Sequence, residues 1–220
     1  MLIHADFSKP AISPADEQVW IRSPESGVDR IMLDRIGDEV ARATSIVRYA
    51  PGSKFSRHEH ALGEEFIVLE GIFSDEHGDY PTGTYVRNPP GSGHSPYSTG
   101  GCRILVKLRQ FDTEDLNPVV IDTSDADLWR ADDDNDISRI MLHEFGNETV
   151  QMLRLPEGTD FSNLIGGGGC ELLVISGSVT FQGLEMVDGS WLRLPAGADL
   201  HLTANRETTL WMKSGHLPGS

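Results

Sequence analysis

Two segments of the chain decide its fold: Gly52-Ser-Lys-Phe-Ser-Arg-His-Glu-His-Ala-Leu-Gly-Glu-Glu-Phe-Ile-Val-Leu-Glu-Gly71 and Gly83-Thr-Tyr-Val-Arg-Asn-Pro-Pro-Gly-Ser-Gly-His94. Short apolar runs alternate in them with glycines and prolines, which is typical of short strands joined by tight turns. Further short strands are expected at residues 30–33, 44–49 and 103–108. The same two segments hold a candidate set of four metal ligands: His58, His60, Glu64 and His94.

The spacing of these four residues sets conditions on how the chain must fold. Side chains alternate along a strand, so His58 and His60 share one face, about 7 Å apart. In a straight strand Glu64 would lie about 20 Å from His58, so the chain must turn back at residues 61–63, which Gly63 permits. A closed sheet can then bring His94 opposite. Three imidazoles and a carboxylate suit Zn²⁺, Fe²⁺, Mn²⁺, Ni²⁺ or Cu²⁺ and do not choose among them.

The second half of the chain repeats the first. Turn and strand residues from Gly52 to Lys107 recur 106 positions later, from Gly158 to Lys213, which indicates the same hairpins in the same order. The four ligand positions fall in the second copy on residues that make no such set: Leu164, Gly166, Cys170 and Leu200. His201 lies one residue past the last position and therefore points to the other face. We predict a second barrel without metal.

Composition narrows the possible partners. The chain has 220 residues and a formal net charge of −16, which disfavours binding to nucleic acid and to anionic membranes. The sequence shows no leader-like segment and no apolar run long enough to span a membrane, so a cytoplasmic protein is expected. The only two cysteines, Cys102 and Cys170, have no CxxC spacing and are expected as small buried apolar residues.

The two segments resemble both signature motifs of the cupin superfamily. Gly52, His58-x-His60, Glu64 and Gly71 match the first motif, and Gly83, Pro89-x-Gly91 and His94 match the second, with Ser98 where the family usually has Asn. The resemblance implies an all-β bicupin made of two tandem double-stranded β-helix (jelly-roll) barrels. We expect an N-terminal arm over residues 1–19, a metal-binding barrel over 20–113 and a degenerate barrel over 114–220.

Within the cupins, residues 57–81 and 87–94 resemble the ChrR-type group. That group includes the cupin half of ChrR anti-ECF-sigma factors, which holds zinc, and it is similar to acetylacetone-cleaving and dihydroxyacetophenone dioxygenases, which use iron. Glu64 as a fourth ligand is closer to the ChrR arrangement. This chain, however, has only a short arm where ChrR proteins carry a helical sigma-binding domain with its own His/Cys zinc ligands.

Three functions follow from this resemblance. The first is a dioxygenase with one divalent transition metal, zinc or iron before manganese or nickel, that cleaves a small diketone or hydroxy-ketone. The second is a ChrR-like regulator or sensor with zinc in the cupin, whose site responds to an oxidant or ligand and changes a contact with a sigma factor or another protein. The third is a barrel that binds a small molecule without catalysis. A homodimer is expected in each case, and the sequence singles out no catalytic residue besides the metal ligands.

Other polar residues are expected to have no role in the site. Hairpin surface is predicted for five residues that could face the pocket: Glu65, Asp75, Glu76, Tyr80 and Tyr97. Surface positions are predicted for four further histidines: His4, His77, His143 and His216. Asp132-Asp-Asp134 lacks the spacing of a calcium loop, so a solvated loop is expected there.

Overall fold

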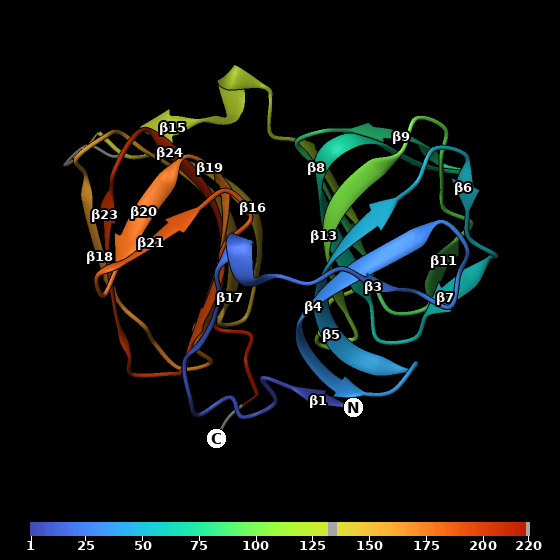
Figure 1. Cartoon of the computed structure of the whole chain (residues 1–220), viewed down its shortest axis with the longest axis horizontal. Helices are drawn as coiled ribbons and strands as arrows, with labels where there is room; N and C mark the ends of the chain where they lie inside the picture. Colours follow the sequence, from blue (N-terminus) through green and yellow to red (C-terminus); the bar gives the residue numbers. More distant parts are fainter. Residues whose placement is uncertain (132–135, 219–220) are drawn as a thin grey trace. The chain divides into compact units, whose positions relative to one another are not determined.

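The computed structural model describes residues 1–131 and 136–218. Nearly every regular element in this part of the chain is a β-strand, which confirms the predicted all-β class (Figure 1). The chain divides into two compact units: residues 1–5 and 19–124 form unit 1, and residues 6–18 with the chain from residue 125 onward form unit 2. The aspartates at 132–134, considered above for calcium, lie outside the described residues.

The larger sheet of unit 1 is antiparallel and carries the strands expected at residues 30–33, 44–49 and 103–108, together with the apolar runs at 66–69 and 84–87. Its strand order is β1-β4-β5-β13-β8-β10-β14. The bounds of these strands are β1 Leu2–Ile3, β4 Val28–Gly37, β5 Ala41–Tyr49, β13 Cys102–Leu108, β8 Glu64–Asp75, β10 Thr84–Asn88 and β14 Val119–Asp122. Along β5 and β13 every second residue points into the barrel, because side chains alternate across a strand.

Short strands close the other side of the unit 1 barrel. They are β6 Ser53–Lys54, β7 His58–His60, β9 Gly78–Pro81, β11 Ser92–His94 and β12 Tyr97–Ser98, whereas β3 Ile21–Arg22 pairs with β4 of the larger sheet. The strands β7 and β11 pair with each other, and β9 forms a hairpin with the end of β8. The turn between β7 and β8 contains Gly63 at φ +77°, where a Cβ atom would collide with the ring of Phe111.

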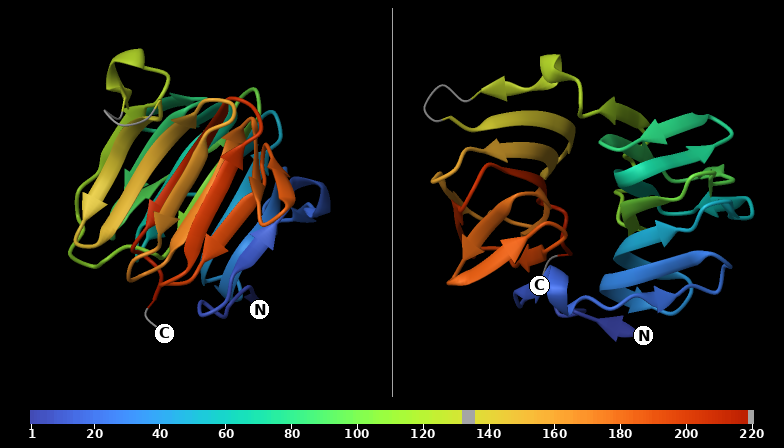
Figure 2. Two further views of the ribbon diagram at one scale, coloured as in Figure 1. Left: turned by 90° about the vertical axis from the view of Figure 1, so that its left-hand side faces the viewer. Right: turned by 45° about the horizontal axis from the view of Figure 1, so that its top comes forward.

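Unit 2 repeats the main strands of this arrangement, although β1 has no counterpart there (Figure 2). Its larger sheet has the order β15-β16-β17-β24-β19-β22-β2, and its smaller sheet has the order β18-β23-β20-β21. The bounds are β15 Arg130–Ala131, β16 Ser138–Phe145, β17 Glu148–Leu155, β24 Thr208–Ser214, β19 Cys170–Ser176, β22 Trp191–Leu194, β2 Ala11–Ser13, β18 Asp160–Leu164, β23 Asp199–Ala204, β20 Ser178–Phe181 and β21 Leu184–Val187. Two tandem barrels of one design are therefore confirmed.

The edge strand of unit 2 comes from the N-terminal segment. Ala11 of β2 pairs with Arg193 of β22, just as Val119 of β14 pairs with Arg87 in unit 1. The arm expected over residues 1–19 thus supplies residues 6–18 to unit 2. No helix among the described residues is long and apolar enough to cross a membrane.

The interior of unit 2 is an apolar core. Cys170 and Leu200, which match Glu64 and His94, both belong to its buried cluster. Leu164, which matches His58, is 71% exposed. His201 is exposed, as its parity predicted, and shares a hydrogen bond of 2.6 Å with Ser162.

Two of the surface predictions for histidine are wrong. His143 is buried on β16, and the side chain of His216 is shielded from solvent, with its Nε2 3.1 Å from a carboxylate oxygen of Glu171. The strand pattern did not reveal the burial of His143, because a bulge in β16 shifts the register between Met141 and His143. His4 and His77 are exposed, as predicted.

Candidate metal centre

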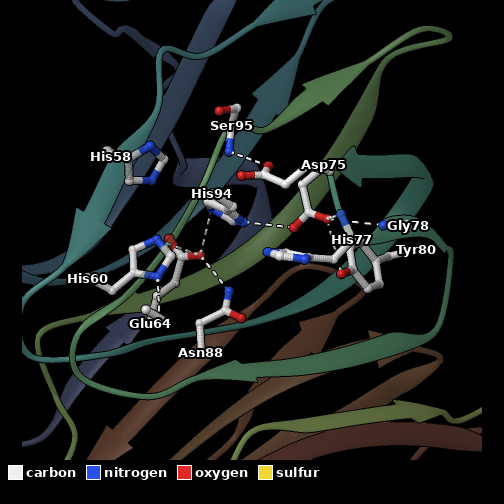
Figure 3. Close-up of polar contacts among 12 residues, drawn as sticks. His58, His60, Glu64, Asp75, His77, Gly78, Tyr80, Asn88, His94 and Ser95 are labelled. Carbon is white, nitrogen blue, oxygen red and sulfur yellow. Dashed lines mark hydrogen bonds and ion pairs between the residues drawn. The ribbon is translucent and has the colours of Figure 1, made fainter.

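The four candidate ligands of unit 1 come together in one cluster (Figure 3). The register of β7 and β11 places His94 directly opposite His58, with His60 two residues further along. Gly93 allows this close pairing, since a Cβ atom there would lie 2.6 Å from the carbonyl oxygen of His58. Glu64 opens β8 after the turn at Gly63. The turn-back that the spacing required is therefore present.

The three imidazole rings converge through the same nitrogen. Their Nδ1 atoms are each engaged: that of His58 with the Ser56 carbonyl at 3.1 Å, that of His60 with Ser92 Oγ at 3.1 Å, and that of His94 with Asp75 Oδ2 at 2.9 Å. The Nε2 atoms are left to face a common point, and ring centroids lie 4.7–5.0 Å apart. An imidazole fixed through Nδ1 presents its Nε2 lone pair, which is how histidine ligands are commonly oriented.

The distances among the ligand atoms fit a single metal ion. Glu64 Oε1 lies 3.5 Å from His60 Nε2 and 3.4 Å from His94 Nε2, and one ligand atom from each of the four residues lies within 4.8 Å of every other. Ligands about 2.0–2.2 Å from a tetrahedral ion are separated by about 3.3–3.6 Å. Among the described residues, the buried His60 Nε2 has no hydrogen-bond partner. Such an orphaned acceptor fits a metal site.

Asp75 supports the site from outside the ligand set. Its Oδ2 accepts the proton of His94 Nδ1, and its Oδ1 accepts from the backbone N–H groups of His77 and Gly78 and from the hydroxyl of Tyr80. Burial works to raise the pKa of Asp75, but the hydrogen bonds from His94 and His77 outweigh it and hold that pKa below its usual value. The ionised carboxylate therefore fixes the tautomer of His94 with its proton on Nδ1.

The protonation behaviour of the histidines differs within the cluster. Burial, aided by the charges of His94 and His58, lowers the pKa of His60 although Glu64 opposes this. For His94, burial also works to lower the pKa, but the hydrogen bond to Asp75 and the charge of Glu64 reverse it, so that the pKa is raised. Metal binding requires neutral imidazoles. His60 therefore offers its lone pair readily at neutral pH, while a metal must displace a proton from His94 as the pH falls.

A cavity of about 430 Å³ adjoins the four residues, all of which line it. Its walls are mainly apolar and come from inward-facing residues of β5 and β13, among them Val47, Tyr49, Ile104, Val106 and Leu108. This size is at the small end of the range for pockets that hold small molecules. A ligand of modest size can therefore reach the ligand atoms within an apolar enclosure.

The prediction of hairpin surface was wrong for three residues. Asp75 and Tyr80 are buried beside His94, as described above. Glu65 is buried on the opposite face of β8, where it accepts hydrogen bonds from Tyr85 and Arg87. Glu76 is exposed and Tyr97 half-buried. The internal repeat held a signal for Asp75: its counterpart 106 residues later is Phe181, so the acid is present only where the ligands are.

A family model, the ChrR cupin-like domain, matches the sequence twice, over residues 8–112 and 116–218. The chain belongs to this family. Each match begins ahead of one edge strand, β2 or β14, so that the two repeats cover both barrels. The expected ChrR-type bicupin is therefore confirmed. No curated protein matches the chain.

Solved structures of other cupins share the fold. A candidate dioxygenase from Nostoc punctiforme aligns with a TM-score of 0.76 at 15% identity, covering 96% of this chain and 84% of the other. The bacterial pirin YhhW from Escherichia coli in complex with nickel(II) has a TM-score of 0.72 at 14% identity, covering 96% and 100%. Salicylate 1,2-dioxygenase from Pseudoaminobacter salicylatoxidans has a TM-score of 0.66 at 11% identity, covering 94% and 81%. At these identities the likeness concerns the fold alone.

Proposed function

We propose that His58, His60, Glu64 and His94 hold one divalent transition metal, and that the protein is a dioxygenase-type enzyme that cleaves a small diketone or hydroxy-ketone. The observation that carries the proposal is the convergence of three Nδ1-anchored imidazoles and one carboxylate on an enclosed apolar cavity. The family resemblance favours iron or zinc. Dioxygenases among the proteins of like fold add support.

Each part of the chain has a defined task in this proposal. A metal held there would supply a Lewis acid for a ketone or enolate oxygen and, if it is iron, redox chemistry with O₂. Asp75 keeps the His94 proton on Nδ1, and Asn88 steadies Glu64 through a hydrogen bond of 3.3 Å to Oε1. The apolar walls formed by Val47 and Val106 exclude water from a bound ketone.

Metal content and oxygen consumption test the proposal. Untagged protein is expected to contain about one metal ion per chain by elemental mass spectrometry, and His58→Ala is expected to lose it. His201→Ala, which removes the exposed histidine of unit 2, is the matched control and should keep the metal. Iron-loaded protein should then consume O₂ with at least one ketone of a diketone and hydroxy-ketone panel. A wild-type protein without metal, or no O₂ uptake across the panel, would contradict it.

A regulator or sensor with zinc is the second candidate, because Glu64 lies within the ligand cluster as in the ChrR arrangement. It predicts zinc rather than iron in the purified protein, no turnover, and a protein partner such as a sigma factor recovered by co-purification. A protein that holds zinc without turnover and without a partner would fit a binding barrel instead. The expected homodimer and cytoplasmic location remain predictions.

A further inference from the structure

Arg30 places a positively charged side chain in the wall of the metal cavity. Its side chain is 18% exposed and lines the cavity, and its buried Nε has no hydrogen-bond partner among the described residues. The carboxylate of Glu39 lies 3.6 Å from Arg30 Nη2 but is itself 69% exposed. A buried guanidinium N–H without an acceptor is costly. Guanidinium groups bind carboxylates through paired hydrogen bonds, so an anionic ligand would satisfy this donor.

Arg35 adds a second positive charge to the same cavity. It is 4% exposed and donates a hydrogen bond to the carbonyl of Asp38. Burial, followed by the charge of Arg30, lowers its pKa, so the two cations act on each other. The register places Arg35 in one row with Ala43, Leu108 and the candidate ligand Glu64, across β4, β5, β13 and β8. Arg35 therefore lies at the same level of the barrel as the metal ligands, whereas the backbone of Arg30 lies in the row of Val47, Ile104 and Val68.

Arg109 is a third arginine in the cavity wall, and its backbone is strained. It adopts φ +60°, a left-handed conformation that favours glycine. Its counterpart in unit 2 is Gly215 at φ +77°, and both backbone N–H groups bond to the matching carbonyls, of Gly63 and Gly169. Unit 1 thus keeps a strained arginine beside its cavity where the repeat has the unstrained residue. Backbone strain of this kind often accompanies function.

The repeat shows which cations accompany the ligand set. In the first long strand of each unit, β4 and β16, the repeat offset is 109 rather than 106, as their pairing with β5 and β17 shows. Arg35 therefore corresponds to Glu144 in unit 2 and Arg30 to Arg139, whereas Arg109 corresponds to Gly215 at the offset of 106. Two of the three cations are thus present only in the barrel that has the metal ligands. The carboxylates lining the cavity other than Glu64 are exposed and therefore lie at its mouth: Glu25, Glu39 and Glu59.

We propose that the cavity binds a small organic anion, a keto- or hydroxy-carboxylate whose carboxylate is held by Arg30 while its ketone or hydroxyl oxygen faces the metal ligands. Arg35 and Arg109 add positive charge that favours the anion over a neutral ketone. The proposal rests on the proposed function, because it places the substrate beside the same four ligands. In a protein with a net charge of −16, this local cluster provides the attraction that the overall charge does not.

Calorimetry with matched acid and amide pairs tests the substrate class. The probes are 2-oxo, 3-oxo and 2-hydroxy acids of four to eight carbons, each beside its primary amide, titrated into zinc-loaded protein that does not consume them. At least one acid is expected to bind tenfold or more tightly than its amide. Equal binding of acid and amide across the panel, or no binding of any acid, would overturn the proposal.

Variants assign the preference to the arginines. Arg30→Gln is expected to weaken binding of the acid at least tenfold and to leave the amide unchanged, and Arg139→Gln in unit 2 is the matched control. Arg109→Gly, which suits the left-handed backbone, should also weaken acid binding while the protein remains folded. Retention of the acid preference in both Arg30→Gln and Arg109→Gly would overturn it. Failure of the proposed enzyme function would appear as missing metal or missing O₂ uptake. The preference for an acid over its amide is measured as binding without turnover, so the two failures are distinguishable.

Discussion

Asp75→Asn is expected to weaken metal binding by altering His94 without touching a ligand. In the native site Oδ1 accepts from the N–H groups of His77 and Gly78 and from the hydroxyl of Tyr80. An asparagine must place its carbonyl oxygen there, because its NH₂ group cannot accept hydrogen bonds. The NH₂ group then faces His94 Nδ1, 2.9 Å away in the wild type from Oδ2. His94 can accept that bond only with its own proton on Nε2, the atom needed for the metal.

The size of the effect follows from the bond that is lost. To bind metal, the variant must either give up the contact to His94 or turn the asparagine away from its three donors. A hydrogen bond to a charged group contributes about 1.5–3 kcal/mol, and about 1.4 kcal/mol corresponds to a factor of ten. Metal affinity should therefore fall about 10- to 100-fold, in line with other supporting groups of metal ligands.

A competition titration against a fluorescent zinc indicator measures this change. Asp79→Asn is the matched control, since Asp79 lies on the same hairpin and accepts from Ser74 Oγ at 2.6 Å without contact to His94. The control should bind zinc as the wild type does. An affinity of Asp75→Asn within about twofold of wild type would refute the reasoning, as would an equal loss in Asp79→Asn, which would indicate a general disturbance of the hairpin.

Three further outcomes are expected. Arg109→Gly should raise the free energy of unfolding by about 0.5–1 kcal/mol in urea titrations, because relief of left-handed strain, about 1–2 kcal/mol, exceeds the entropy lost by glycine. Gly215→Ala should lower the free energy of unfolding, since the Cβ would collide with Asn147. Burial raises the pKa of Cys170 to about 12. Little of this cysteine is then present as reactive thiolate at pH 8, so we expect a disulfide reagent to modify the thiol only when the protein unfolds. Chelation of the metal should lower the Tm of wild type but not that of His58→Ala, because a bound ion stabilises the folded state by about 4 kcal/mol at a thousandfold excess over Kd.

The convergence of the four candidate ligands could be predicted from sequence because local geometry determines it. Strand alternation fixes His58 and His60 on one face, and glycine at position 63 permits the reversal that returns Glu64 to them. The pairing of His94 with His58 follows from the closed barrel. Each step depends on a few neighbouring residues or on a motif at fixed spacing, so it can be inferred from the sequence alone.

The supporting residues could not be predicted because they depend on tertiary direction. Asp75 contributes to the site only because His94 Nδ1 points toward it. The composition of its hairpin, taken alone, predicts a surface position. The segment at residues 6–18 likewise gave no sign of joining unit 2: β2 has three residues, too short for a periodic pattern, and its place is set by pairing with a strand almost the whole chain away. Long-range pairing of this kind leaves little trace in local sequence.

The repeat also indicates that the site is one cooperative set. His94, Asp75 and Tyr80 correspond to Leu200, Phe181 and Met186 in unit 2, and all three replacements belong to its apolar core. A buried imidazole without its carboxylate, or a buried carboxylate without its imidazole, is an unpaired polar group that costs free energy. Loss of one member therefore favours loss of the others, and a barrel is stable either with the complete polar set or with none of it. Unit 1 keeps the complete polar set, together with the strained Arg109. Unit 2 shows that the same barrel fold can form with an apolar core in place of these polar residues.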